Sequence, residues 1–185
     1  IFSLSYSLKK KGFRKFISFH DFKGAANKGS IEMIKKFIKK NDTNLIKDIN
    51  QVFINHYRNN ICIKSKLKSN VLSFLNECKK KKIKLFISTN KSEENAKLIL
   101  KKLKIIKLFN FIAGNNTFPH RKPNPLHLQM LKKKFSLKKN ETIFIGDSEI
   151  DSTLAKKFKI KFILIKNGYT LIKHTKIKAD FLVTN

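Results

Sequence analysis

The chain has 185 residues and a formal net charge of +30, with 42 cationic and only 12 acidic side chains. This length suits one well-cored domain, or a core domain that carries a smaller lobe. No apolar run approaches the roughly 20 residues that cross a bilayer, and no signal-peptide pattern is present. Cys62 and Cys78 are too few for a disulfide framework. The sequence therefore predicts a cytoplasmic protein without a membrane partner.

The positive charge comes almost entirely from lysine. Arginine occurs only as Arg14, Arg58 and Arg121, so 39 of the 42 cationic residues are lysines. Dense cations bind phosphate backbones, but base reading and bidentate phosphate recognition favour arginine. The lysines are spread along the chain together with abundant Ile, Asn and Phe, a composition that AT-rich coding produces without selection for binding. We therefore do not expect nucleic acid to be a partner.

The first third of the chain is predicted to be helical from position 30 onward. Residues 1–29 have no clean period, and residues 24–29 are typical of a loop. The two expected helices are one that Ser30 caps, with Ile31, Ile34, Phe37 and Ile38 on one stripe, and one over residues 43–57, with Leu45, Ile49, Val52, Phe53 and His56 on one face. The short Asn41-Asp42 turn predicts an antiparallel helical hairpin. A polar connection follows, and we divide the chain into residues 1–66 and 67–185.

From position 69 the pattern alternates between helix and strand. The expected elements are a helix with Val71, Leu72, Leu75 and Cys78 on one face, a strand at 83–87, a helix capped by Ser92, a strand at 111–113, a helix opened by Pro125, a strand at 142–145, a helix at 149–158, and strands at 161–165 and 181–183. Repeated strand–helix units predict an α/β fold with a mostly parallel sheet and helices on both faces.

Three polar segments share one context, because each follows a predicted strand or begins the next helix. They are Ser88-Thr89-Asn90, Lys122-Pro123-Asn124-Pro125 and Gly146-Asp147-Ser148. The carboxyl ends of strands converge in a doubly wound sheet. A hydroxyl, an ammonium group and two carboxylates gathered there suit a phosphate group and a divalent cation such as Mg²⁺.

These segments, in this order, closely resemble three motifs of the haloacid dehalogenase-like phosphatase superfamily, above all its phosphoglycolate phosphatase-like members. Ile87–Lys91 resembles the second motif, Arg121–Pro125 the third, and Ile145–Asp151 the fourth. The resemblance continues through Asn167-Gly168-Tyr169. It implies a Rossmann-type parallel sheet with helices on both faces, and a small helical cap in the first part of the chain.

The resemblance also implies roles for individual residues. Thr89 is expected to bind the transferring phosphoryl group, with Asn90 helping to orient it. Lys122 is expected to hold the phosphoryl oxygens and the charge of the nucleophile. Asp147 and Asp151 form the implied Mg²⁺ site, with Asp151 supporting either the metal or Lys122. The activity implied is Mg²⁺-dependent hydrolysis of a small phosphorylated metabolite, such as phosphoglycolate, through an aspartyl-phosphate.

The first motif of that superfamily, two aspartates flanking one residue, does not occur in these 185 residues, and Asp21 and Asp42 stand in the wrong context. The chain starts at Ile1 rather than at methionine, so we expect the motif to lie upstream and the chain alone to be inactive. The alternatives are a phosphosugar mutase, a pyrophosphatase, or a non-catalytic basic protein that binds phosphate or nucleic acid. The oligomeric state is left open by the sequence.

Two of these patterns also have purely structural interpretations. Ser148 with Asp151 matches a helix-capping sequence, in which a carboxylate at the third helical position stabilises the N-terminus. The five histidines, among them His56, His120 and His127, form no metal-binding pattern. We assign the histidines to the surface or to ordinary packing.

Overall fold

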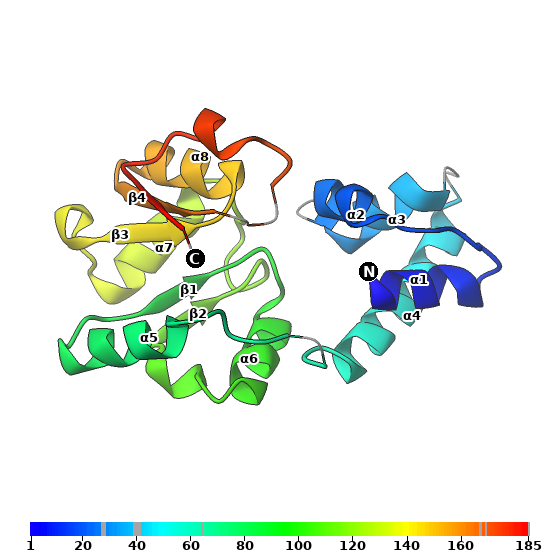
Figure 1. The fold of residues 1–185 in the computed structure, drawn as a ribbon, viewed down its shortest axis with the longest axis horizontal. Coiled ribbons are helices and arrows are strands. Elements are labelled where there is room, and N and C mark those ends of the chain that lie inside the picture. The colour runs from blue at the N-terminus through cyan, green and yellow to red at the C-terminus, as the bar shows by residue number, and fades with distance from the viewer. Residues whose placement is uncertain (27–28, 39–41, 64, 167, 169, 185) are drawn as a thin grey trace. The chain divides into compact units, whose positions relative to one another are not determined.

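The computed structural model describes residues 1–26, 29–38, 42–63, 65–166, 168 and 170–184. The chain forms two compact units, Ile1–Ile63 and Lys64–Asn185 (Figure 1). None of the helices within the described ranges is long and apolar enough to cross a membrane.

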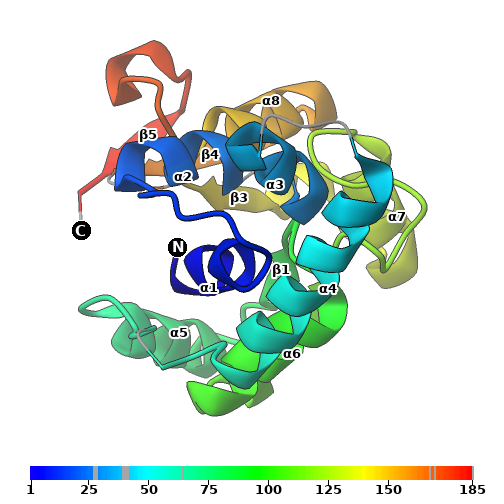
Figure 2. The same cartoon turned by 90° about the vertical axis from the view of Figure 1, so that its right-hand side faces the viewer.

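The first unit is built of four helices, α1 (Phe2–Lys10), α2 (Phe19–Ala26), α3 (Ser30–Ile38) and α4 (Thr43–Asn59). Helices α1 and α3 pack against α4, and α2 packs against α3 (Figure 2). Their shared apolar core consists of Leu4, Leu8, Ile17, Ala25, Met33, Ile34, Phe37, Ile38, Ile46 and Ile49. The unit therefore has a hydrophobic core of its own.

The prediction that residues 1–29 lack regular structure was wrong. Helix α1 buries Ser3 and Ser7 beside Leu4 and Leu8. Because half of its buried face is serine, the sequence shows no helical repeat of apolar residues there. At the start of α2, the Asp21 amide donates to Ser18 Oγ at 3.0 Å, and that hydroxyl donates to Asp21 Oδ2 at 2.6 Å. This reciprocal cap starts a helix that continues through Gly24, where we expected a loop.

The two predicted helices of this unit are confirmed, with small shifts in their buried faces. Helix α3 turns Met33 inward, while Ile31 remains 36% exposed. Helix α4 is capped by Asp42 and fully buries Ile49, as expected, together with Ile46, which the predicted stripe missed. Asn41, half of the expected turn, and residues 27 and 28 of the expected loop lie outside the described residues.

The second unit alternates helices with short parallel strands. Its elements are α5 (Val71–Lys80), β1 (Phe86–Ser88), α6 (Glu93–Lys102), η1 (Ile106–Leu108), β2 (Phe111–Ala113), α7 (Leu126–Phe135), η2 (Lys139–Glu141), β3 (Ile143–Gly146), α8 (Glu149–Phe158), β4 (Lys161–Ile165), η3 (His174–Lys176) and β5 (Phe181–Val183). The predicted alternation is confirmed. Strand β1 starts three positions later than expected, and Ile83 is 53% exposed.

The strands form two parallel sheets rather than one. Strand β1 pairs with β2, whereas β3, β4 and β5 pair in that order. In the described chain no ladder joins β1 to β3, although Figure 1 shows the two sheets in one unit. Both sheets pack against one cluster: Phe86 and Phe111 from the first and Phe144 from the second contact the residues Ala113, Leu128, Leu131, Leu154 and Phe158. One layer of helices, α7 and α8, therefore covers both sheets.

Strand β3 is confirmed at Ile143–Gly146, one residue later than expected, and it is only partly buried. Its side chains alternate, so that Phe144 faces the shared cluster, while Ile143 and Ile145 are 54% and 42% exposed. In the parallel register Ile145 lies beside Ile163, and Ile163 lies beside Phe181. The face of this sheet opposite α8 is therefore apolar and partly uncovered.

Replacing Asp42 with alanine is expected to destabilise the first unit, because its Oδ1 accepts the amide protons of Asn44 and Leu45, both at 3.0 Å. Loss of such a cap costs about 0.5–2 kcal/mol. Asp48→Ala in the same helix is the control, since it removes only an exposed ion pair with Lys11, worth about 0–1 kcal/mol. Urea unfolding followed by circular dichroism measures both, and equal losses would contradict the capping role.

Candidate functional site

The candidate site is built at the carboxyl ends of strands β1 and β3. Thr89 directly follows β1, and Asp147 directly follows β3. Lys122 lies in the loop that leads from β2 into α7. This is the edge at which open α/β sheets bind their ligands. The local structure therefore agrees with the context expected from the three sequence motifs.

Lys122 and Asp151 form a nearly buried ion pair. Lys122 Nζ donates to Asp151 Oδ1 at 2.8 Å, and the two side chains are only 12% and 6% exposed. The ammonium group also lies 5.7 Å from the centroid of the Phe144 ring. Burial removes both charges from water, so each depends strongly on the other. The pair fixes the Lys122 ammonium group beside the start of α8.

The second oxygen of Asp151 holds the start of α8. Asp151 Oδ2 accepts a hydrogen bond from Ser148 Oγ at 2.7 Å and one from the Asp147 amide at 3.2 Å. A Cβ on Gly146 would lie 2.4 Å from Asp151 Cβ, which explains the glycine at this position. The capping sequence proposed for Ser148 and Asp151 is not formed, because the Ser148 side chain caps no backbone amide of α8 and instead donates its hydroxyl proton to Asp151.

Asp147 lies against the loop that follows β4. A Cβ built on Gly168 would come within 2.2 Å of Asp147 Cβ and 2.3 Å of Asp147 Oδ2. Only a glycine leaves room for this carboxylate in its present position. Asn167 and Tyr169, which carry the rest of that sequence resemblance, lie outside the described residues.

Asn90 connects the β1 segment to the Lys122 loop. The Thr89 amide donates to the Ala113 carbonyl at 2.9 Å, and Thr89 Oγ1 accepts from the Lys91 amide at 3.2 Å. Asn90 Nδ2 donates to the Lys122 carbonyl at 3.3 Å. Two buried oxygens here, Ser88 Oγ and Asn90 Oδ1, have no hydrogen-bond partner among the residues described. Buried polar atoms without partners are costly, which suggests that a further group binds beside them.

A second set of hydrogen bonds fixes the loop after β2. The Gly114 amide donates to Thr117 Oγ1 at 2.8 Å, and that hydroxyl donates to Glu93 Oε2 at 2.5 Å. Hydrogen bonds from Lys97 and Thr117 hold the pKa of Glu93 below its ordinary value. Ser92 caps α6 as predicted, accepting from the Asn95 amide. Sequence reasoning identified this helix start but missed its connection to the β2 loop.

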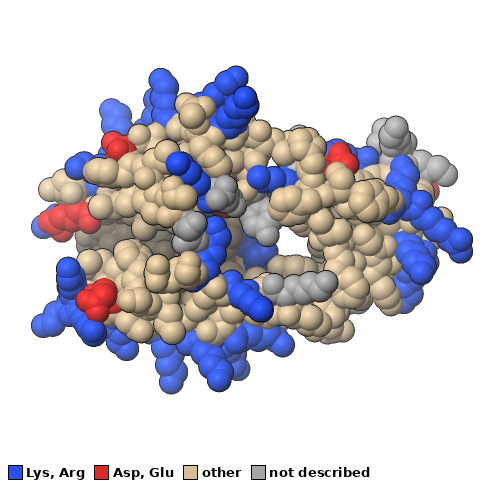
Figure 3. Space-filling view, in the orientation of Figure 1, with Lys and Arg blue, Asp and Glu red and all other residues tan. Residues whose placement is uncertain are grey.

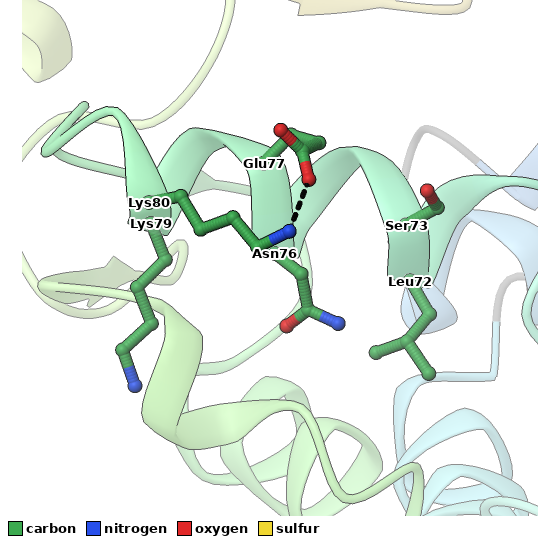
Figure 4. Close-up of a pocket in the computed structure, with 6 residues that line it drawn as sticks. All are labelled: Leu72, Ser73, Asn76, Glu77, Lys79 and Lys80. Carbon is green, nitrogen blue, oxygen red and sulfur yellow. Dashed lines mark hydrogen bonds and ion pairs between the residues drawn. The ribbon is translucent and has the colours of Figure 1, made fainter.

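One surface depression lies on helix α5, away from the candidate site residues. It measures about 750 Å³ and is lined by Leu72, Ser73, Asn76, Glu77, Lys79 and Lys80, all on α5 (Figure 4). Its charged residues include an exposed Glu77–Lys80 pair at 2.7 Å, and none of the candidate site residues contributes to its walls. A face of a single helix with one exposed ion pair does not make a catalytic site.

Four of the five predicted residues are thus joined by direct contacts. Asn90 contacts Lys122, Lys122 contacts Asp151, and Asp151 contacts the Asp147 backbone. Thr89 is next to Asn90 in sequence, and its hydroxyl accepts from the Lys91 amide rather than contacting the other members. Within the described ranges no group of three or more His, Cys, Asp or Glu side chains is placed to hold a metal ion. The structure therefore assembles an ammonium group and two carboxylates, but not a complete cage for a cation.

The comparison with protein families matches residues 1–165 to the model for haloacid dehalogenase-like hydrolases. The chain belongs to this family. The match confirms the resemblance found in the three motifs, and it includes the helical first unit as well as β1 to β4.

Similar proteins carry one recurrent name. A phosphoglycolate phosphatase of Colwellia psychrerythraea is 33% identical over 131 residues, which cover 71% of this chain and 58% of that protein. One of Mesorhizobium japonicum is 32% identical over 120 residues, covering 65% and 53%. The chain thus spans little more than half of these two relatives. One of Agrobacterium fabrum is 26% identical over 185 residues, covering 98% and 79%.

Solved structures confirm the fold. The crystal structure of a predicted phosphoglycolate phosphatase from Haemophilus somnus has a TM-score of 0.91 at 24% identity and covers 98% of this chain and 84% of that one. A structure of CbbY from Rhodobacter sphaeroides, in complex with xylulose-(1,5)bisphosphate, has a TM-score of 0.81 at 17% identity and covers 98% and 84%. At these identities the likeness concerns architecture alone, and it agrees with the predicted α/β fold.

Removing Asp151 is expected to destabilise the second unit strongly. Asp151→Ala leaves the nearly buried Lys122 ammonium group without a counter-charge and removes the acceptor of the Ser148 hydroxyl and the Asp147 amide, at a cost of about 3–5 kcal/mol. Glu141→Ala is the matched control, because Glu141 pairs with Lys138 at 3.1 Å with both side chains well exposed. Denaturant unfolding compares the two, and a loss for Asp151→Ala as small as that of the control would contradict the role assigned to the pair.

Proposed function

We propose that this chain carries the phosphate- and metal-binding part of a Mg²⁺-dependent phosphatase that hydrolyses a small phosphomonoester. The observation that carries the proposal is the nearly buried Lys122–Asp151 pair beside Asp147, at the carboxyl edge of parallel strands. Family membership and the shared name of the relatives support the same reaction class. The cysteine usage and the absence of spanning helices among the described residues are compatible with a cytoplasmic enzyme.

Each polar residue has a role in this proposal. The Thr89 hydroxyl donates to an oxygen of the transferring phosphoryl group, and Asn90 keeps that segment fixed to the Lys122 loop. Lys122 neutralises negative charge that develops on the phosphoryl oxygens in the transition state. Asp151 keeps the ammonium group in place, since its Oδ1 accepts from Lys122 at 2.8 Å. Electrostatic positioning is therefore the main contribution of these residues.

Asp147 fits a magnesium ion better than Asp151 does. Magnesium prefers oxygen ligands, and it commonly binds one or two carboxylates together with waters and substrate phosphates. Both Asp151 oxygens already accept hydrogen bonds, from Lys122, Ser148 and the Asp147 amide. The Asp147 carboxylate lies directly against Gly168, where a Cβ would come within 2.3 Å of Oδ2. We therefore assign Asp147 as the direct ligand and Asp151 as its support; the bound ion would neutralise phosphoryl charge.

The nucleophile is proposed to come from a strand that lies between β1 and β3. Two parallel sheets share one helical layer but are joined by no ladder in the described chain, and Ser88 Oγ beside this interruption has no partner there. A strand bearing an Asp-x-Asp pair would complete the sheet. One aspartate would form the aspartyl-phosphate and the other would serve the leaving group. No such pair exists in the 185 residues, so we expect this chain alone not to turn over substrate.

The substrate is proposed to be a small phosphorylated metabolite, with phosphoglycolate as the first to test. The names of the relatives support this choice. We propose that residues 1–66, which include the helical first unit Ile1–Ile63, form a cap that sets specificity, and that residues 67–185 form the core. A phosphosugar mutase or a pyrophosphatase would use the same core residues, so a panel of small phosphate esters is needed to distinguish them.

Phosphate- or nucleic-acid binding without catalysis is the rival function. On the one face seen in Figure 3, lysine and arginine side chains lie along the edges of both units as well as across them, rather than in a single patch. Scattered lysines favour solvation over a backbone-binding surface, which needs cations along one track. This distribution supports the enzyme proposal.

The deciding experiment compares the complete gene product with the 185-residue chain. We expect Mg²⁺-dependent phosphate release from small esters by the complete product, no turnover by the chain alone, and loss of activity in Asp147→Asn of the complete product. Phosphate release is measured colorimetrically with and without a chelator. Turnover that is unaffected by Asp147→Asn, or salt-sensitive nucleic-acid binding without any turnover, would overturn the proposal.

Gly168→Ala in the complete product tests the position of Asp147. The added Cβ would displace the carboxylate, so the Mg²⁺ concentration needed for half-maximal activity is expected to rise about tenfold or more. Gly146→Ala is the comparison, because its Cβ would press on Asp151 and should mainly lower the free energy of unfolding. An unchanged magnesium requirement in Gly168→Ala would show that Asp147 does not hold the ion.

A further inference from the structure

His127 is a fully buried, ionisable side chain that the proposed reaction does not use. It lies in the first turn of α7 and has 0% of its surface exposed. Its ring packs edge-on against Phe118, with centroids 5.5 Å apart. Histidine is rarely buried so completely without a specific hydrogen bond.

The ring is bound to the start of the loop that carries Lys122. His127 Nδ1 lies 2.9 Å from the carbonyl oxygen of His120, seven residues earlier. A carbonyl only accepts, so Nδ1 must carry the proton. Two backbone bonds close the loop further: the Asn124 amide donates to the Arg121 carbonyl at 2.9 Å, and the His127 amide donates to the Asn124 carbonyl at 3.2 Å. His127 thus holds the loop that positions Lys122 at two points, through its ring at His120 and through its amide at Asn124.

The other ring nitrogen has no partner in the described part of the protein. His127 Nε2 is buried and accepts or donates no hydrogen bond. With Nδ1 protonated, neutral histidine presents only a lone pair at Nε2, whereas the cation would bury an unpaired N–H and a full charge. Burial lowers the pKa of His127, and the Lys122 cation lowers it further, whereas the bond to the His120 carbonyl acts in the opposite direction.

We propose that neutral His127 is a positioning residue that fixes the Lys122 loop through its bond to the His120 carbonyl, and that protonation of His127 releases this loop. The charged groups around it favour this direction. Lys122 repels the imidazolium, the Asp151 carboxylate is already paired with Lys122, and His120 presents its carbonyl rather than a counter-charge. Because the folded state holds His127 neutral, its contribution is present at neutral pH and is lost as the pH falls below about 6.5.

The first test measures the loop itself and needs no activity. Amide hydrogen exchange in the complete gene product, expressed as protection factors that correct for intrinsic pH dependence, is followed at Asn124 and at residue 127 between pH 5 and 8. Wild type should lose protection on acidification. His127→Asn, whose side-chain amide replaces Nδ1–H and does not titrate, should stay protected throughout. His127→Leu should be unprotected at every pH, while the last turns of α7 stay protected in all three.

Two results would overturn the inference: the same pH dependence in wild type and His127→Asn, or a protected loop in His127→Leu. If His127→Leu does not fold, the comparison of wild type with His127→Asn still decides. A second readout rests on the proposed function. Loss of the hydrogen bond to the His120 carbonyl in His127→Leu should lower kcat about tenfold to a hundredfold with little change in KM. His127→Asn should restore kcat. An inactive wild type would contradict the phosphatase proposal, whereas the hydrogen-exchange data would still test the role of His127 in holding the loop.

Discussion

The second unit depends on the nearly buried ion pair between Lys122 and Asp151. Two charges taken out of water must satisfy each other, so the β2–α7 loop, the start of α8 and the end of β3 are held in one arrangement. Gly146 follows from this constraint, because a Cβ there would collide with Asp151, and Gly168 makes the same room for Asp147. A site that must hold phosphate and metal charges benefits from such fixed geometry, because positioned charges need no rearrangement during reaction.

The sequence predicted the parts whose signal is local. Residues 149–158, 161–165 and 181–183 form the expected elements, because a helix start at Ser148 and short β-rich runs are marked by neighbouring residues. Helix α1 escaped prediction because serines occupy half of its buried face, and α2 because its cap, Ser18 with Asp21, precedes a glycine. The exposure of Ile143 and Ile145 was also missed. Burial of a strand depends on what covers it, and no local pattern records that.

The same distinction applies to the site. Thr89, Asn90, Lys122, Asp147 and Asp151 were predicted from motifs and their resemblance, and the structure joins four of them through direct contacts. His127 was assigned to ordinary packing, since one histidine in an apolar helix face has no distinguishing pattern. Its role depends on the His120 carbonyl seven residues earlier and on the lack of a hydrogen-bond partner for Nε2 among the described residues. Both are properties of the folded loop.

The central claim is that Thr89, Lys122 and Asp147 surround a phosphoryl group. Titration of the complete gene product with orthophosphate in the presence of Mg²⁺, followed by NMR, tests it most directly. The account predicts that the amide signals of Thr89, Asn90 and Asp147 shift together with one binding constant, and that Lys122→Ala abolishes the shifts. Shifts confined to other parts of the chain, or unchanged binding in Lys122→Ala, would contradict it.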